Sequence, residues 1–272
     1  MSDEKIAVVA FEGWNDAGEA ASGAIDHLID QFQARLIYTF DPEPYYDFQV
    51  NRPFLRWDTQ GNRVIEWRTT HIYEAKTESG RVFYLVRGIE PSMHWQTFSK
   101  EFLRQVNNLG ISTVIALGSL LSDTPHTRPI PVTAVAMTES MAKLFDIEIS
   151  EYEGPTGILG VIQQILSFNN IAGMSLWAAV PHYVSQPPSP KASMALLDAL
   201  DEIINLPIPL GDFPNRTEIW QKQVNSLIEN DEDMAEYVQK LELEGDSSDL
   251  STTSGDEIAK EFERYLRRRE NK

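Results

Sequence analysis

Residues 118–131 contain a carboxylic acid, an imidazole and a guanidinium within a few positions of one another. The ionisable residues of this segment include Asp123, His126 and Arg128. An imidazole can move a proton at neutral pH, a carboxylate can orient it, and a guanidinium can hold an anionic group. The G-x-S-x-G pattern of a nucleophile elbow is absent, and a Ser-His-Asp arrangement is recognised by geometry rather than by sequence order. We interpret the segment first as a structural or interface segment, with catalysis by Asp123 and His126 as the alternative.

The spacing of His126 and Arg128 adds a second expectation for this segment. The two residues flank Thr127, so in an extended backbone their side chains would project to the same face. Such a pair is suited to gripping an anion or a carboxylate of a neighbouring subunit.

The turn after the first apolar run is another candidate site, because open α/β sheets bind ligands at the carboxyl ends of their strands. It matches neither G-x-G-x-x-G nor G-x-x-x-x-G-K-[ST], and its two carboxylates would repel a phosphate group. We expect Asn15 or Asp16 to cap the following helix, with Asp16 as a further candidate catalytic carboxylate. The candidates for binding a ligand or a partner in this turn are Gly13, Trp14 and Asn15.

A third candidate is the turn at residues 153–157, which reads Glu-Gly-Pro-Thr-Gly and precedes an apolar helical stretch. Its candidate binding residues are Gly154, Thr156 and Gly157. Each of the three candidate turns lies next to a predicted strand or helix of the core. The arrangement of these strands and helices therefore decides whether the turns lie close together.

Composition excludes several classes of function. The formal net charge of −18 would repel a nucleic-acid backbone. The absence of cysteine excludes disulfides, thiolate catalysis and Cys-type metal sites, and the five histidines lack the spacing of a zinc site. No apolar run approaches the roughly 20 residues of a membrane helix, and the N-terminus does not read as a signal peptide. We therefore expect a cytoplasmic protein with no metal, cofactor, nucleic-acid or membrane partner.

The alternation of apolar runs and helical periodicities predicts an α/β core over residues 1–212. Runs buried on both faces are typical of parallel strands covered by helices, which predicts a three-layer sandwich with a mostly parallel central sheet. The expected strands are 6–11, 35–40, 113–117, 132–137 and 173–180, and the expected helices are 17–32, 92–108, 139–145, 158–168 and 191–205. A long loop is expected over 118–131, and Ser92 is expected to cap its helix.

Residues 41–88 interrupt this pattern with a strand-rich excursion, expected to contain strands at 63–69, 71–75 and 81–86. Few basic residues accompany its aromatic side chains, so we expect these to pack within the sheet rather than to stack on nucleic-acid bases. The aromatic residues concerned are Trp57, Trp67, Tyr73, Phe83 and Tyr84.

Residues 213–272 form a predicted acidic, helical C-terminal appendage. A proline-rich connector precedes it, and apolar residues then recur at three- and four-residue steps from 220 to 241. A flexible link is expected near 245–255, and Ser254 with Glu257 fits a capping box for a final helix.

The three turns together resemble the proteasome assembly chaperone 2 family, in its bacterial branch. The residues that correspond to the family's motifs are Gly13, Asn15, Gly118, Gly154, Thr156 and Gly157. The likeness covers roughly residues 5–211 and leaves the appendage outside. It implies a phosphorylase/hydrolase-like α/β sandwich that associates with itself or with related chains. Eukaryotic relatives have a chaperone role in the assembly of proteasome α-rings, which the resemblance suggests for this family. The resemblance does not imply an enzymatic activity.

Two functions follow from these observations. The first is a non-catalytic, assembly-chaperone-like protein that forms a homo-oligomer and binds proteasome-related or other proteins, with an appendage able to dock on a partner. The alternative is a hydrolase or phosphorylase-like enzyme acting on a small molecule. Its site would lie at the carboxyl ends of the strands, with Glu12, Trp14, Asn15 and Asp16 facing Asp123, His126 and Arg128.

Overall fold

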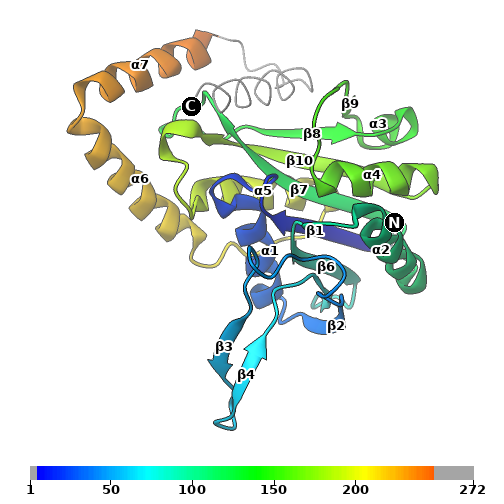
Figure 1. The fold of residues 1–272 in the computed structure, drawn as a ribbon. Helices are drawn as coiled ribbons and strands as arrows, with labels where there is room; N and C mark the ends of the chain where they lie inside the picture. Colours follow the sequence, from blue (N-terminus) through cyan, green and yellow to red (C-terminus); the bar gives the residue numbers. More distant parts are fainter. Residues whose placement is uncertain (1–4, 248–272) are drawn as a thin grey trace.

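A computed structural model describes residues 5–247 and shows a three-layer α/β sandwich built on an eight-stranded sheet (Figure 1). The strands are β1 (Ile6–Glu12), β2 (Arg35–Thr39), β3 (Phe54–Trp57), β4 (Arg63–Glu66), β5 (His71–Lys76), β6 (Val82–Ile89), β7 (Thr113–Ser122), β8 (Val132–Ala136), β9 (Glu148–Ile149) and β10 (Ala172–Pro181). Their order in the large sheet is β2-β5-β6-β1-β7-β10-β8-β9. The central neighbours β6, β1, β7 and β10 are parallel, and β2, β5 and β8 pair antiparallel. The expected fold class is confirmed.

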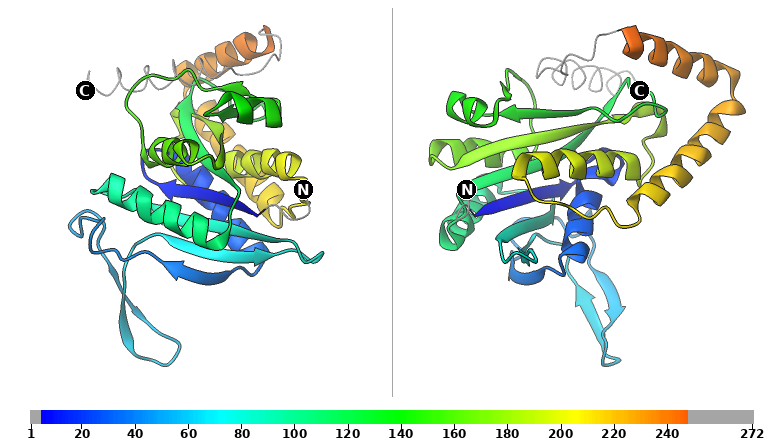
Figure 2. Two further views of the ribbon diagram at one scale, coloured as in Figure 1. Left: turned by 90° about the vertical axis from the view of Figure 1, so that its right-hand side faces the viewer. Right: turned by 180° about the vertical axis from the view of Figure 1, so that it is seen from behind.

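Helices cover both faces of this sheet (Figure 2). They are α1 (Ala20–Gln31), α2 (Trp95–Leu109), α3 (Glu139–Phe145), α4 (Ile158–Phe168), α5 (Pro190–Ile204), α6 (Phe213–Glu229) and α7 (Glu232–Ser247). Successive residues of a strand point to opposite faces, so β1 sends Val8 toward α1 and α5 and sends Val9 toward α2 and α4. Both side chains are fully buried. Burial on both faces is the reason that β1 reads as a continuous apolar run.

Two local predictions in the core are wrong. Strand β7 continues to Ser122, through the first residues of the expected loop, because β10 pairs with it residue by residue up to Pro181. Helix α2 begins after His94 rather than at a Ser92 cap. The Ser92 hydroxyl instead accepts a hydrogen bond from the Asp47 backbone N–H, at 3.1 Å.

Strands β3 and β4 form a separate two-stranded hairpin that projects away from the sandwich (Figure 1). No other strand in residues 5–247 pairs with it. The expectation that its tryptophans pack inside the sheet is wrong, since Trp57 is 71% exposed and Trp67 is 42% exposed. Phe83 and Tyr84, which belong to the large sheet, are buried as expected.

Helices α6 and α7 form the described part of the appendage. They leave the end of α5 as an arm and bend over the ends of β7 and β10 (Figures 1 and 2). Helix α7 continues to Ser247, so the first residues of the expected link at 245–255 are helical. The rest of that link, and the capping box expected at Ser254 and Glu257, lie outside the described residues.

Candidate functional site

The segment with the ionisable cluster is a turn that lies beneath the appendage. Residues 126 and 127 form the turn, and the Arg128 N–H donates to the Pro125 carbonyl at 3.3 Å. The backbone is therefore not extended here, and the shared-face geometry expected for His126 and Arg128 does not arise. We call residues 123–128, together with Tyr183, the appendage seat.

His126 is the centre of the appendage seat and is 1% exposed. Its Nε2 is 2.8 Å from the Asn225 Oδ1 of α6, and its Nδ1 is 2.8 Å from the Tyr183 hydroxyl. An amide oxygen only accepts hydrogen bonds, so Nε2 carries the proton and Nδ1 accepts from Tyr183. Burial lowers the pKa of His126, which favours this neutral form. Lys191 closes the seat from α5 by donating to the His126 carbonyl, at 2.6 Å.

Asp123 and Arg128 also make their contacts with the appendage. Asp123 Oδ1 accepts from the Tyr237 hydroxyl of α7 at 3.0 Å and is 3.1 Å from His182 Nδ1. Arg128 lies 3.6 Å from the Glu242 carboxylate, also on α7. Arg128 therefore meets a carboxylate of its own chain, whereas the spacing of His126 and Arg128 suggested an anion or a carboxylate of a neighbouring subunit.

Asp16 lies elsewhere along the edge of the sheet. Its Oδ1 accepts hydrogen bonds from the backbone N–H groups of Ala21 at 2.8 Å and Ser22 at 3.1 Å, which confirms its expected role as a helix cap. Burial raises the pKa of Asp16 to about 6. The residue pairs beside Ser119 on β7. Asp123 follows Ser119 by four residues, about 13 Å at the rise of a strand. The structure does not bring the two carboxylates together.

Glu12 belongs to a network of ion pairs. Its carboxylate pairs with Arg68 and with Arg87, the latter at 2.6 Å, and Arg87 continues to Asp26 at 2.8 Å. This chain of charges joins the hairpin's return segment to β1, β6 and α1. None of these contacts involves the appendage seat.

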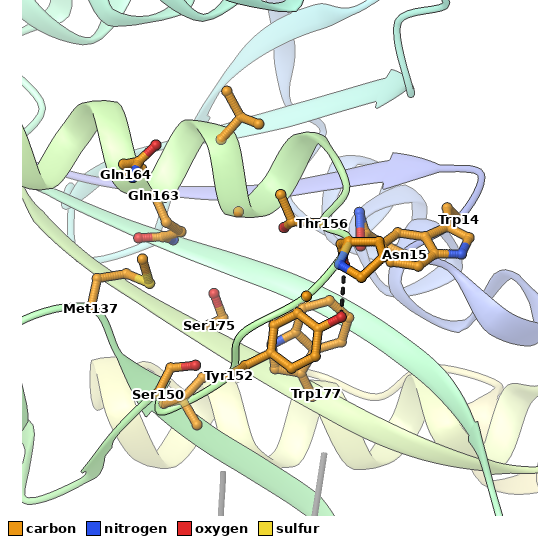
Figure 3. A pocket seen from close by; sticks show the side chains of 15 residues that line it. Trp14, Asn15, Met137, Ser150, Tyr152, Thr156, Gln163, Gln164, Ser175 and Trp177 are labelled. Atoms are coloured by element: carbon orange, nitrogen blue, oxygen red, sulfur yellow. Dashed lines mark hydrogen bonds between the residues drawn. The ribbon is translucent and has the colours of Figure 1, made fainter. Parts of the chain in front are cut away.

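The first and third candidate turns do meet, across a pocket with a volume of about 260 Å³. Its lining includes Trp14 and Asn15 of the first turn and Gly154 and Thr156 of the third. Figure 3 labels Trp14, Asn15 and Thr156 among the side chains that line it. Trp177 of β10 belongs to its wall as well. The sequence analysis named both turns as candidates, although it gave no reason to place them together.

Glycines allow the close packing around this pocket. A Cβ atom on Gly157 would lie 2.0 Å from Asn15 Nδ2, and a Cβ on Gly118 would lie 2.5 Å from the Trp177 ring. Either contact is far too short for a real side chain. Gly13 has a φ of +121°, which favours glycine. These glycines therefore allow the close packing that shapes the pocket.

Sequence reasoning missed most of the other residues of the pocket, among them Tyr152, Gln163 and Trp177. Gln163 falls on the predicted apolar helix and Trp177 on a predicted strand, where each reads as an ordinary packing residue. The one available signal was the pair of glutamines, Gln163 and Gln164, within an otherwise apolar helix.

Within residues 5–247, no group of three His, Asp or Glu side chains is placed to hold a metal ion. None of the described helices has the length and apolar character needed to span a membrane.

The fold and the two turns around the pocket define a class: a three-layer α/β sandwich with an inserted hairpin and a C-terminal helical arm. The family model described as the PAC2 family matches residues 10–228, and the chain belongs to that family. The match runs past residue 211, the end expected from sequence, and covers α6 except for its last residue. None of the curated proteins matches the chain.

Solved structures agree with this assignment. A PAC2 family protein from Streptomyces avermitilis is 48% identical, with a TM-score of 0.82 over 86% of this chain and 100% of that chain. A proteasome-assembly chaperone homologue from Mycobacterium tuberculosis is 44% identical, with a TM-score of 0.77 over 86% of this chain and 99% of that chain. An archaeal proteasome activator from Pyrococcus furiosus shares the fold, at 18% identity and a TM-score of 0.67 over 82% of this chain and 93% of that chain.

Proposed function

We propose that this chain is a non-catalytic, cytoplasmic assembly protein that associates with further copies of itself through the β3–β4 hairpin and binds proteasome-related proteins. The observation that carries the proposal is the exposed apolar surface of the hairpin. Large apolar surfaces on an otherwise ordinary protein surface are typical of sites that contact another protein.

The hairpin presents one face that is more apolar than the other. Leu55 and Ile65 are direct partners across the two strands, and Trp57 follows Leu55 by two positions, so these three side chains share a face. They are 55%, 56% and 71% exposed, respectively. An isolated two-stranded ribbon is marginally stable in water. Contact with a second protein would therefore stabilise the hairpin as well as bury its apolar face.

Charge favours a second copy of the chain as the occupant of this face. Residues 50–68 contain four arginines against one aspartate and one glutamate, whereas the whole chain has a net charge of −18. The hairpin is thus a basic projection on an acidic protein, and the surface of another copy complements it. Arg63 stacks over the Trp57 ring at 5.8 Å, which holds both side chains in place.

The appendage seat supports a non-catalytic role. The enzyme alternative requires Asp16 to face Asp123 and His126, yet Asp16 caps α1 about 13 Å away along the strand. His126 is buried between Tyr183 and Asn225 and is closed off from solvent by the arm. These polar groups hold the appendage in place.

The relatives give the class of partner. The M. tuberculosis structure carries the description of a proteasome-assembly chaperone homologue and is similar over most of this chain. The experiment mixes the purified chain with proteasome α-subunits of its own organism and follows assembly by native mass spectrometry. We expect a homo-oligomer that binds α-subunits and changes the yield or rate of their assembly. A monomer that leaves α-subunit assembly unchanged would contradict the proposal.

A further inference from the structure

The pocket between the first and third turns contains no charge that could bind an ion. None of its lining side chains within residues 5–247 is acidic, basic or histidine. Aromatic and amide groups dominate the wall instead. Trp14, Tyr152 and Trp177 provide the rings, and Asn15 and Gln163 are two of the amides (Figure 3). Burying an ion without a countercharge is costly, so this lining selects an uncharged ligand.

The helix N-terminus beside the pocket is already occupied. Helix α4 begins at Ile158, where an anion would ordinarily find free N–H groups. Here the Glu90 carboxylate accepts from the Ile158 N–H at 2.8 Å. The same carboxylate approaches the first turn, since Glu90 Oε2 would lie 3.6 Å from a Cβ on Gly13. A fixed carboxylate in that place would repel a phosphate or a carboxylate ligand.

The amides of Asn15 and Gln163 shape the wall of the pocket rather than its binding surface. The residues are 3% and 1% exposed. Asn15 Nδ2 packs against Gly157 and Gln163 Oε1 packs against Gly173, where added Cβ atoms would lie 2.0 and 2.1 Å away. Within residues 5–247 neither atom has a hydrogen-bond partner, whereas Gln163 Nε2 donates to the Met174 carbonyl at 2.8 Å. The other uncharged polar side chains of the lining are therefore the ones open to a ligand.

The size and walls of the pocket limit the shape of its ligand. At about 260 Å³ the pocket is smaller than the roughly 300–1,000 Å³ typical of sites for drug-sized molecules. Aromatic side chains on several sides favour a flat ring between them. The absence of a side chain at Gly118 lets the Trp177 ring settle against β7.

From these observations we propose that the pocket binds a small, uncharged, planar molecule that carries both a hydrogen-bond donor and an acceptor, such as an aromatic amide. Uncharged polar side chains of the lining, such as Gln164 and Ser175, would pair with its donor and acceptor, and the aromatic walls would hold its ring. This site is separate from the hairpin and from the appendage seat, so it is independent of the proposed assembly role.

Three ring compounds of nearly equal shape test the charge selection: benzamide, benzoate and benzamidinium. The chain contains six tryptophans, so labelling with 5-fluorotryptophan gives a small set of fluorine resonances. Trp14→Phe and Trp177→Phe variants assign the two pocket resonances. We expect benzamide to shift these two resonances, and both charged isosteres to bind about tenfold more weakly. Equal or tighter binding of a charged isostere, or no shift of either resonance with benzamide, would overturn the proposal.

Filling the pocket tests its location. Met137→Trp at the more exposed rim places a larger side chain in the space of the ligand and should abolish the shifts that benzamide causes. Gln105→Leu on α2 is the control and should leave binding unchanged. Unchanged benzamide binding in the folded Met137→Trp variant contradicts the site.

Discussion

Two parts of this molecule project from the same sandwich, and they differ in where their contacts lie. The α6–α7 arm returns to its own core, where His126 contacts Asn225 and Asp123 contacts Tyr237. The β3–β4 hairpin leaves Trp57 71% exposed. Among residues 5–247, the arm therefore has its partner within the chain, and the hairpin does not.

This difference distinguishes a structural role for the arm from an interaction role for the hairpin. Buried apolar residues such as Val224 and Val238 hold the arm, and hydrogen bonds to the appendage seat fix its position. On the hairpin, apolar side chains of the same size face water, which is unfavourable by about 25 cal/mol for each Å² left exposed. A second copy covering the hairpin would remove that cost.

The largest expected effect comes from the apolar face of the hairpin. The double variant Trp57→Ser and Ile65→Ser removes two large contact side chains, and we expect self-association to weaken about 1,000-fold, since each such anchor contributes about 2 kcal/mol. The sandwich should unfold at the same temperature as before. Analytical ultracentrifugation measures the association. Val64→Ser, on the opposite face of the hairpin, is the control. Unchanged association in the double variant would remove the hairpin from the interface.

The second-largest effect is expected at Asp16, which belongs neither to the arm nor to the hairpin. Its pKa is raised from 3.8 to about 6 by burial, so the folded state binds a proton more tightly than the unfolded state does. Its contribution to stability is present below pH 4 and is lost as the pH rises to about 6, by about 3 kcal/mol. Asp16→Asn should remove this loss while keeping an oxygen to cap α1.

Urea unfolding of the Asp16→Asn variant at pH 5 and pH 8 checks this prediction. The variant should be at least as stable as the wild type at pH 8, and its stability should change less between the two pH values. Asp30→Asn, at the exposed end of α1, serves as the control. A marked loss of stability at pH 8 would mean that the charge of Asp16 is required for the fold.

A smaller effect is expected in the arm itself. His126→Ala removes the side-chain partner of Asn225 and one of the two hydrogen bonds of the Tyr183 hydroxyl, which should destabilise docking of the arm by about 2 kcal/mol. Hydrogen exchange of the α6 amides should then accelerate roughly 30-fold, while the central strands keep their protection. His71→Ala, on an outer strand, should leave α6 unaffected. If α6 exchange does not change, the seat does not hold the arm.

Protonation should loosen the arm in the same way. Burial lowers the pKa of His126, so below the ordinary value near 6.5 the undocked state takes up a proton first. Docking is fully stable above that pH and weakens as the pH falls. Lys191 opposes protonation and Glu242 favours it. Exchange of α6 measured from pH 7.5 to pH 5.5, corrected for intrinsic rates, should show the loss in the wild type and not in His126→Ala.

The smallest effect is expected at Arg128. Its side chain and that of Glu242 are 42% and 27% exposed, and the charged atoms are 3.6 Å apart. Ion pairs exposed to this extent contribute about 0–1 kcal/mol, so Arg128→Ala should change α6 and α7 exchange by less than about fivefold. An effect as large as that of His126→Ala would show that charge, rather than burial, positions the arm.

The sequence predicted the sheet and its helices well, because β1, β7 and β10 are apolar on both faces and their pattern leaves few alternatives. It also indicated the two turns of the pocket through their glycines. It could not indicate that His126 meets Asn225, since nearly one hundred positions separate them and only the path of the arm brings them together. Gln163 and Asn15 likewise line one pocket although they lie far apart in the sequence.

The hairpin was the harder case for a physical reason. Aromatic and β-branched residues in alternation predict a strand, and a strand with such residues usually packs against a core. Trp57 and Ile65 carry that signal and yet face solvent. An apolar pattern indicates burial without specifying whether the same chain or another provides the covering surface.

The most direct test of the comparison uses the absence of cysteine from the chain, which makes single-site labelling clean. Thr59→Cys at the hairpin turn and Ala235→Cys on α7 each carry a benzophenone crosslinker, and each variant is mixed with ¹⁵N-labelled wild-type chain before irradiation. Mass spectrometry then separates crosslinks within a chain from crosslinks between light and heavy chains. We predict crosslinks between chains from residue 59 and within the chain from residue 235. Crosslinks from residue 59 confined to its own chain would contradict the account.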